Sequence, residues 1–217
     1  MKMNLRKIAM GLGLCIALVA CSKEEETIVV PVSVSTRTVN DLAADTVTGL
    51  GADGRPQSAG TTTYYSLVDN KIIASTDAAS TKWDIAFSST KILVNCGTSG
   101  PGIGGAFVFK GLFDDLKTIP VDSSFATDNS NAASFAIPLG SGRAWYTYDG
   151  LTTLVSPIAG RVLVIRTATG KFAKIEIISY YKGGVTLPAS ASVNDKLFKQ
   201  RYYTFRYTYQ SNGSKTF

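Results

Sequence analysis

The sequence contains no histidine, and its three methionines, Met1, Met3 and Met10, all lie within the first ten residues. The absence of histidine excludes Ser-His-Asp and Cys-His catalysis, as well as the zinc sites that depend on imidazole. If the N-terminal segment is removed, the rest of the chain has neither histidine nor methionine. Any function that needs imidazole or thioether groups is then beyond its chemistry.

Cysteine is almost as scarce, with Cys15, Cys21 and Cys96 as the only three. Two of them belong to the N-terminal segment, so the rest of the chain has one thiol and no partner for an internal disulfide. Stability must therefore come from a hydrophobic core, for which about 197 residues are sufficient.

The charge balance gives no indication of a nucleic-acid partner. The formal net charge is +6, but three of the 22 basic residues precede Cys21, which leaves 19 basic against 16 acidic residues. The remaining excess is spread along the chain, whereas nucleic-acid binding needs a concentrated basic patch. We therefore expect no nucleic acid among its partners.

The N-terminus has the pattern of a secretory signal. Basic residues precede an apolar run over residues 8–20 that is too short for a membrane-spanning helix. The run ends in Leu-Val-Ala before Cys21, which resembles the lipobox of bacterial lipoproteins. We therefore expect a signal peptide over residues 1–20, a lipid anchor on Cys21, and a tether leading into an edge strand over residues 21–62. The acidic run at residues 24–26 resembles a surface-export signal of Bacteroidetes lipoproteins, or is a solvated part of the tether.

β-Strand patterns dominate the rest of the chain. The plainest covers residues 160–181, where two apolar runs flank a turn centred on Gly170 and predict a β-hairpin. Its first arm is apolar at every position over residues 162–165, as in a strand covered on both faces. In its second arm Lys174 and Glu176 alternate with apolar residues, which predicts one solvent-exposed face.

Further strands are expected at residues 63–68, 72–74, 83–87, 91–95, 105–110, 145–148, 152–158 and 202–209. In the third of these, alternation predicts that Trp83, Ile85 and Phe87 share one face. Helical periodicity is limited to one short turn within residues 193–201, with Asn194 or Asp195 as its N-cap.

The predicted fold class is therefore all-β, with a single antiparallel β domain over residues 63–217 that closes as a barrel, as a sandwich or not at all. Residues 111–143 interrupt the strand pattern with turn-type composition and isolated phenylalanines. A long irregular segment of this kind is commonly functional or disordered, and its phenylalanines predict that it packs onto the domain.

No stretch carries an enzyme signature. Residues 100–105 match G-x-G-x-x-G, but a strand pattern follows instead of the helix that would bind phosphate, so a tight turn is the better interpretation. Asp114 and Asp115 are neighbours on a loop without an opposing carboxylate, and Cys96 at a strand end is typical of a small buried residue. We predict that the protein is not an enzyme.

The chain contains an ordered set of segments: WDIAF (83–87), NCGTSG (95–100), IRTATGKFAK (165–174), SYY (179–181) and YTFRY (203–207). In this order they resemble the HmuY family of haem-binding lipoproteins of Bacteroidetes. The resemblance runs from about Tyr64 to the C-terminus. It implies an all-β lipoprotein of the outer membrane, exposed at the cell surface, that captures haem or a related porphyrin for delivery to a TonB-dependent outer-membrane receptor.

The sequence departs from this family at the iron ligands. Members that bind haem well hold the iron between two histidines or two methionines, and this chain has neither beyond residue 10. Haem iron also accepts tyrosine or cysteine, so the candidate ligands are Tyr146, Tyr148 and Cys96. Other possibilities are a porphyrin held by apolar walls without axial bonds, or a different ligand in the same pocket. Candidate pocket walls are Phe113, Phe125 and Trp145. Tyrosines on alternating strand faces are commonly packing residues, so the alternative is a structural or adhesive surface lipoprotein of the same fold without haem.

Overall fold

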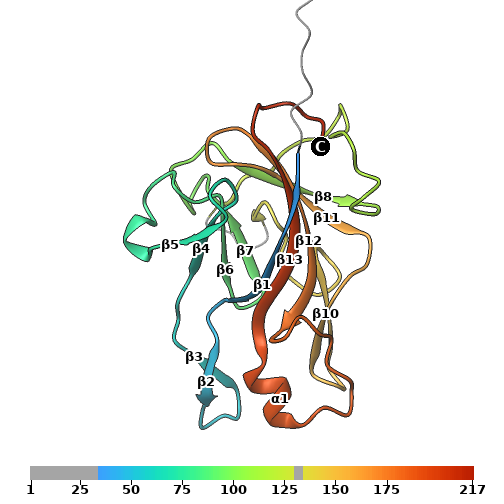
Figure 1. Ribbon diagram of the computed structural model, residues 1–217. Coiled ribbons are helices and arrows are strands. Elements are labelled where there is room, and N and C mark those ends of the chain that lie inside the picture. Colours follow the sequence, from blue (N-terminus) through green and yellow to red (C-terminus); the bar gives the residue numbers. More distant parts are fainter. Residues whose placement is uncertain (1–33, 130–133) are drawn as a thin grey trace, which may run out of the picture. The chain divides into compact units, whose positions relative to one another are not determined.

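The computed structural model describes residues 34–129 and 134–217, so the predicted signal peptide and Cys21 lie outside the described residues (Figure 1). The regular elements of the described chain are β-strands, apart from the helix α1 (Val193–Phe198) and the 3-10 turn η1 (Ser75–Asp77). Every strand pairing is antiparallel. The predicted all-β antiparallel fold is confirmed.

A five-stranded sheet forms one layer of the domain. Its strands, in spatial order, are β1 (Thr36–Ala43), β13 (Gln200–Gln210), β12 (Phe172–Tyr181), β11 (Arg161–Arg166) and β8 (Gly105–Lys110). The predicted hairpin is its centre, because β11 and β12 pair directly with Leu163 opposite Ile175. The four residues at 162–165 have exposed fractions of 0%, as expected for a strand covered on both faces.

A four-stranded sheet forms the second layer, with β5 (Lys71–Ile73), β4 (Thr63–Ser66), β6 (Ile85–Ser88) and β7 (Lys91–Val94) in that order. The main core lies between the two sheets. The Phe87 ring is stacked on that of Phe205 at 5.5 Å between centroids, and Tyr65 meets Phe205 edge-on at 5.7 Å. Contacts between the inner faces of two antiparallel sheets define a β-sandwich, which resolves the question of closure.

Trp83 does not lie on the same face as Ile85 and Phe87, so that prediction is wrong. Strand β6 begins only at Ile85, and the Asp84 carboxylate turns into the interior to accept hydrogen bonds from the backbone N–H groups of Leu67 and Ala168. The alternation is therefore broken before the strand starts. Trp83 packs instead against Tyr64, with ring centroids 5.0 Å apart.

Smaller elements gather at one end of the sandwich, the lower end in Figure 1. They are the hairpin of β2 (Val47–Leu50) and β3 (Pro56–Ser58), the hairpin of β9 (Tyr146–Asp149) and β10 (Leu154–Pro157), and α1. The predicted helical turn is present, but its N-cap is Ser192, whose Oγ accepts a hydrogen bond from the Asp195 N–H. The N-cap lies two or three residues earlier than the sequence suggested, so Asn194 and Asp195 lie inside the helix.

The outer face of the five-stranded sheet is covered by the first part of the irregular segment. Phe113, Leu116 and Ile119 pack there against Val162 and Val164. The prediction that this segment packs onto the domain is thus confirmed for its described first part. Phe217 packs on the same cluster, and its N–H donates to the Lys117 carbonyl oxygen at 2.7 Å.

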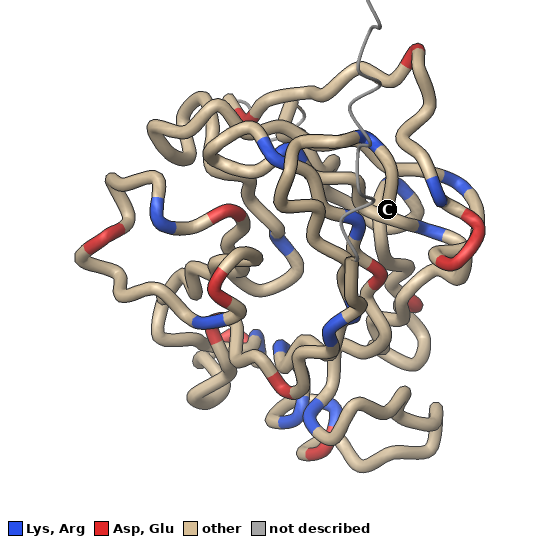
Figure 2. Tube along the Cα trace, turned by 45° about the horizontal axis from the view of Figure 1, so that its top comes forward, with Lys and Arg blue, Asp and Glu red and all other residues tan. Residues whose placement is uncertain are grey.

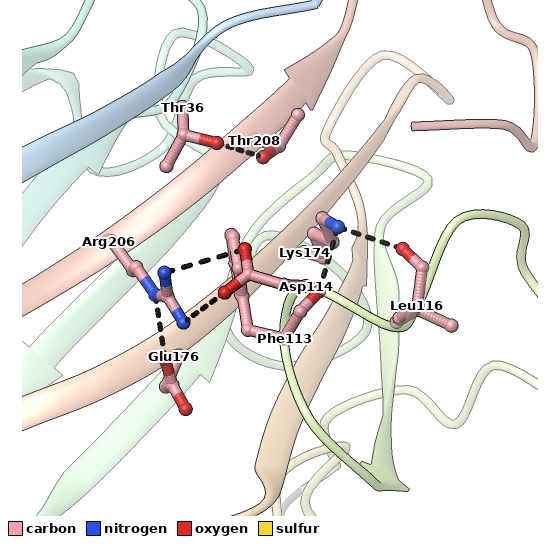
Figure 3. A network of polar contacts seen from close by, with 8 residues as sticks. All are labelled: Thr36, Phe113, Asp114, Leu116, Lys174, Glu176, Arg206 and Thr208. Atoms are coloured by element: carbon pink, nitrogen blue, oxygen red, sulfur yellow. Dashed lines mark hydrogen bonds and ion pairs between the residues drawn. The ribbon is translucent and has the colours of Figure 1, made fainter.

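The predicted solvent-exposed face of β12 is wrong at Lys174, which is 4% exposed. The covering segment turns two carbonyl groups toward it, and the Lys174 Nζ donates to Phe113 O at 2.9 Å and to Leu116 O at 2.8 Å (Figure 3). Burial of the ammonium lowers the pKa of Lys174. Sequence alternation placed Lys174 on the correct face of the strand, but it could not indicate that a distant loop covers that face.

Candidate functional site

The six candidate site residues do not come together at one pocket in the described chain. Phe113 and Phe125 belong to the cluster on the outer face of the five-stranded sheet. Cys96, Trp145 and Tyr146 belong to the main core between the sheets. Tyr148 stands apart from both groups on β9, with 51% of its surface exposed. The position of each therefore has to be considered separately.

Cys96 is enclosed by protein. Its side chain is 1% exposed, and its Sγ accepts a hydrogen bond from the Asp128 N–H at 3.3 Å. Burial raises the pKa of the Cys96 thiol, which keeps it protonated and lowers its power as a nucleophile or as a metal ligand. This is the environment of a small packing residue.

Trp145 and Tyr146 are also packing residues. Trp145 is 2% exposed, its Nε1–H donates to the Thr90 carbonyl oxygen at 3.2 Å, and its ring lies 5.2 Å from that of Tyr203. Tyr146 is 8% exposed, and its ring lies 4.7 Å from that of Trp145. A ligand would have to displace this aromatic packing to reach the Tyr146 hydroxyl.

Tyr148 lines a groove at the lower end of the sandwich, which we name the end groove. Its volume is about 480 Å³, within the range of about 300–1,000 Å³ that is usual for small-molecule sites. Three separate segments form it: the β2–β3 hairpin, the β9–β10 hairpin and α1. The lining side chains include Leu50, Pro56, Tyr148, Leu151, Val193 and Lys196.

Much of the apolar surface of the end groove faces solvent. Leu151 is 97% exposed, Val193 75% and Leu50 53%, although each comes from a different segment of the chain. Single exposed apolar residues are ordinary, but a group that converges on one concave surface is typical of a binding site.

The Asp149 carboxylate fixes the conformation of the turn at the tip of the β9–β10 hairpin. Its Oδ1 accepts a hydrogen bond from the Leu151 N–H at 2.9 Å, and its Oδ2 accepts one from Thr152 Oγ1 at 2.6 Å. These hydrogen bonds, that from Thr152 first, lower the pKa of Asp149. Thr153 adopts a φ of 60°, the left-handed conformation that completes the turn. The turn therefore presents Leu151 outward as a fixed feature.

The β2–β3 wall of the end groove is fastened at its base by Asp45, which is 7% exposed. Asp45 Oδ2 accepts from Ser58 Oγ at 2.8 Å, and Oδ1 accepts from the Thr61 N–H at 2.9 Å. Arg201 adds an ion pair, with Nη1 3.5 Å from Oδ2. One carboxylate thus joins both ends of the hairpin to β13.

Lys196 is the cation of the end groove. It is half-buried on α1, and its Nζ donates to the Ala189 carbonyl oxygen at 2.7 Å. The next lysine along the helix, Lys199, pairs with Asp195 at 2.9 Å. Elsewhere on the described trace, basic and acidic residues are intermixed (Figure 2). The end groove therefore combines aliphatic walls with a phenol and an ammonium group.

A second hollow, of about 600 Å³, lies beside β4 and β5. Its lining consists of small and hydroxyl residues at 60–63 and 74–75, with Tyr64, Ile72 and Ile73 and no charged side chain. It provides nothing that would orient a charged ligand, so the end groove is the stronger candidate. Within the described parts of the chain, no group of three His, Cys, Asp or Glu side chains is placed to hold a metal ion.

Comparison with known proteins agrees with the resemblance read from the sequence. The family model described as HmuY protein matches residues 58–191, which is more than half of the chain. The chain belongs to the HmuY family. That match begins at the last residue of β3 and includes the whole β9–β10 hairpin, but it ends just before α1.

Solved structures that match this chain include an HmuY analogue and an HmuY-like protein. The apo HmuY analogue of Tannerella forsythia is 13% identical, with a TM-score of 0.45, and the match covers 82% of this chain and 96% of that one. A Bacteroides vulgatus protein described as HmuY-like is 12% identical, with a TM-score of 0.46 and coverage of 80% and 90%. None of the curated proteins matches this chain.

None of the described helices is long and apolar enough to cross a membrane. Sequence reasoning singled out Tyr148 but missed the other lining residues, among them Leu50, Leu151, Val193 and Lys196. A signal for Leu151 was present, because an apolar residue in a turn between Gly150 and Thr152 has no packing role that the strand pattern explains. The convergence of three separate segments has no signal in the sequence.

Proposed function

We propose that this HmuY-family protein binds haem or a related porphyrin in the end groove. The proposal rests mainly on the end groove, a concave apolar surface in a chain of this family with the phenol of Tyr148 in its wall. The aliphatic side chains of Leu50, Leu151 and Val193 would contact the porphyrin ring. Burial of their exposed apolar surface provides the driving force for binding.

One side chain of the end groove, Tyr148, could bind haem iron. Tyrosine oxygen is an established ligand of ferric haem, and Tyr148 supplies one at the end groove. The chain has no histidine, and its methionines lie within residues 1–10, so the iron ligand proposed here is an oxygen. We assign Tyr148, and neither Tyr146 nor Cys96, as that ligand, because the latter two are enclosed in the core.

The cellular setting is part of the same proposal. The N-terminal sequence supports a lipoprotein anchored through Cys21 and exposed on the outer membrane, with haem as cargo for a TonB-dependent receptor. A carrier must release its cargo, and one oxygen ligand in an open groove suits release better than an enclosed site. The role proposed is binding and transfer, not catalysis.

Haemin titration tests the proposal. The full-length chain, purified in detergent and compared with a detergent blank, should shift the Soret band of haemin in a saturable manner. Tyr148→Phe should move the band toward that of unligated haemin. Tyr146→Phe removes a hydroxyl two residues away on the same strand and should leave the spectrum unchanged, as should Cys96→Ala. Absence of a Soret shift in the wild-type chain would refute haem ligation.

A further inference from the structure

Building on the proposed function, we propose that the end groove selects its ligand by peripheral carboxylates and a flat apolar body, and not by the metal. The ligand class is the carboxylated tetrapyrrole, with or without iron. On this view the iron–Tyr148 bond changes the spectrum of bound haem but decides little of its affinity.

The end groove offers few side chains that could bind iron, and they come from one wall. Tyr148 is the only tyrosine among the residues that line the end groove, and the lining contains no carboxylate and no cysteine. The walls contributed by the β2–β3 hairpin and α1 near Tyr148 are largely aliphatic, with Leu50, Val193 and Leu197. A ligand held between these walls receives at most one strong bond to a metal, and most of its contact is apolar.

Lys196 brings a positive charge to the wall of the end groove. An ammonium group has three N–H donors, and one of them is used by the Ala189 carbonyl oxygen. Among the ion pairs of the described chain none involves Lys196, whereas its neighbour Lys199 is already paired with Asp195. Lys196 therefore has donors left for an incoming carboxylate, and such charge-assisted hydrogen bonds are stronger than neutral ones.

Asp149, the carboxylate at the tip of the β9–β10 hairpin, makes no ion pair with Lys196 within the described chain. Both oxygens of Asp149 are occupied by the turn, through Leu151 N–H and Thr152 Oγ1. Lys196 also lowers the pKa of Asp149, after the hydrogen bonds from Thr152 and Leu151, so its positive charge reaches the β9–β10 tip. An anionic group at the mouth of the groove would be attracted by Lys196 and repelled by Asp149, so it gains most in direct contact with Lys196.

Apolar walls with one cation at the rim match a ligand that is flat and apolar over most of its area and acidic at one edge. Protoporphyrin and haem share this form, and they differ only at the metal. Replacing both carboxylates with esters keeps the ring and removes the charge. These three compounds therefore separate recognition of the carboxylates from recognition of iron.

The experiment measures the affinity of the full-length chain for haemin, iron-free protoporphyrin and haemin dimethyl ester by fluorescence quenching, with Lys196→Gln and a matched control. The control is Lys199→Gln, which removes the same charge from the same end of the helix but outside the groove lining. We expect protoporphyrin to bind about as tightly as haemin and the ester to bind more weakly. Lys196→Gln should weaken haemin and protoporphyrin alike by about fivefold, and Lys199→Gln by less than about twofold.

Each contrary outcome has a distinct meaning. Tight binding of haemin without binding of protoporphyrin would overturn metal-independent selection and leave the proposed haem-binding function intact. Equal binding of haemin and its ester, or equal effects of the two lysine substitutions, would overturn recognition through Lys196. Failure of all three compounds to bind would refute the proposed function itself.

Discussion

Lys174 lies with its Nζ 4.5 Å from the centre of the Phe113 ring and donates a hydrogen bond of 2.9 Å to the carbonyl oxygen of the same residue. Phe113 thus contacts the ammonium through both its ring and its backbone. The Arg206 guanidinium lies 4.4 Å from the centre of this ring and pairs with Asp114 and Glu176 (Figure 3). These contacts hold the irregular segment against the sheet.

Lys174→Met should loosen this segment. The substitution keeps the apolar part of the side chain but removes two hydrogen bonds and leaves the carbonyl oxygens of Phe113 and Leu116 without them. Relief of the burial cost of the charge offsets part of the loss, so we expect a decrease of about 1–2 kcal/mol in the free energy of unfolding. Urea unfolding measures it, with Lys110→Met at an exposed strand end as control. Equal stability of the two variants would contradict this role.

Stability should fall in alkaline solution. Burial raises the pKa of Tyr180 from 10.0 to about 12, so between these pH values the folded chain keeps a proton that the unfolded chain releases. Because the unfolded state binds fewer protons, the free energy of unfolding falls as pH rises, by up to about 1.4 kcal/mol per pH unit for each such group. Tyr203 and Tyr65, also raised by burial, add to the effect.

The measurement is the urea midpoint at several pH values from about 9 to about 11 in the wild-type chain and in Tyr180→Phe. The variant lacks one titrating group and should show a shallower decline. A midpoint that is independent of pH in the wild-type chain would contradict the assignment of buried, protonated tyrosines.

Asp45→Asn should release the β2–β3 wall of the end groove. Asparagine tolerates the φ of 59° at this position, so the change removes the charge without adding backbone strain. The ion pair with Arg201 is lost, and one of the two carboxylate acceptors becomes a donor. We expect faster amide exchange over residues 47–58 and a loss of about 1–2 kcal/mol in stability. Asp53→Asn, whose partner Arg55 is solvent-exposed, serves as control and should change neither quantity.

How far the sequence predicted the molecule depends on the range of the interactions involved. The β11–β12 hairpin was predictable, because its turn and its apolar runs are local. The environments of Lys174 and Trp83 were not, since a loop about 60 residues away covers the first and the buried Asp84 carboxylate displaces the second. Of the site, only Tyr148 was identified from the sequence, because the end groove exists only where three distant segments converge.

Leu151→Ser should weaken haemin binding with little effect on folding. The side chain is 97% exposed, so the folded protein gains almost no stability from it, whereas a ligand in the end groove would cover it. We expect affinity to fall by about five- to tenfold, because the ligand would no longer bury part of one aliphatic side chain. Val121→Ser, also exposed at 89% but outside the groove lining, is the matched control. An unchanged affinity in Leu151→Ser would place the ligand elsewhere.

Strand β1 sets the distance between the start of the described chain and the end groove. It starts at Thr36 opposite Thr208 and ends at Ala43 opposite Tyr202, two residues after the groove residue Gln200, at which β13 begins. A bulge between Val39 and Leu42, where Asp41 adopts a φ of 52°, makes the strand shorter than the roughly 26 Å of eight fully extended residues. The strand therefore acts as a rigid spacer between the point where the described chain begins and the end that carries the groove. The sandwich itself thus separates the start of the described chain from the end groove.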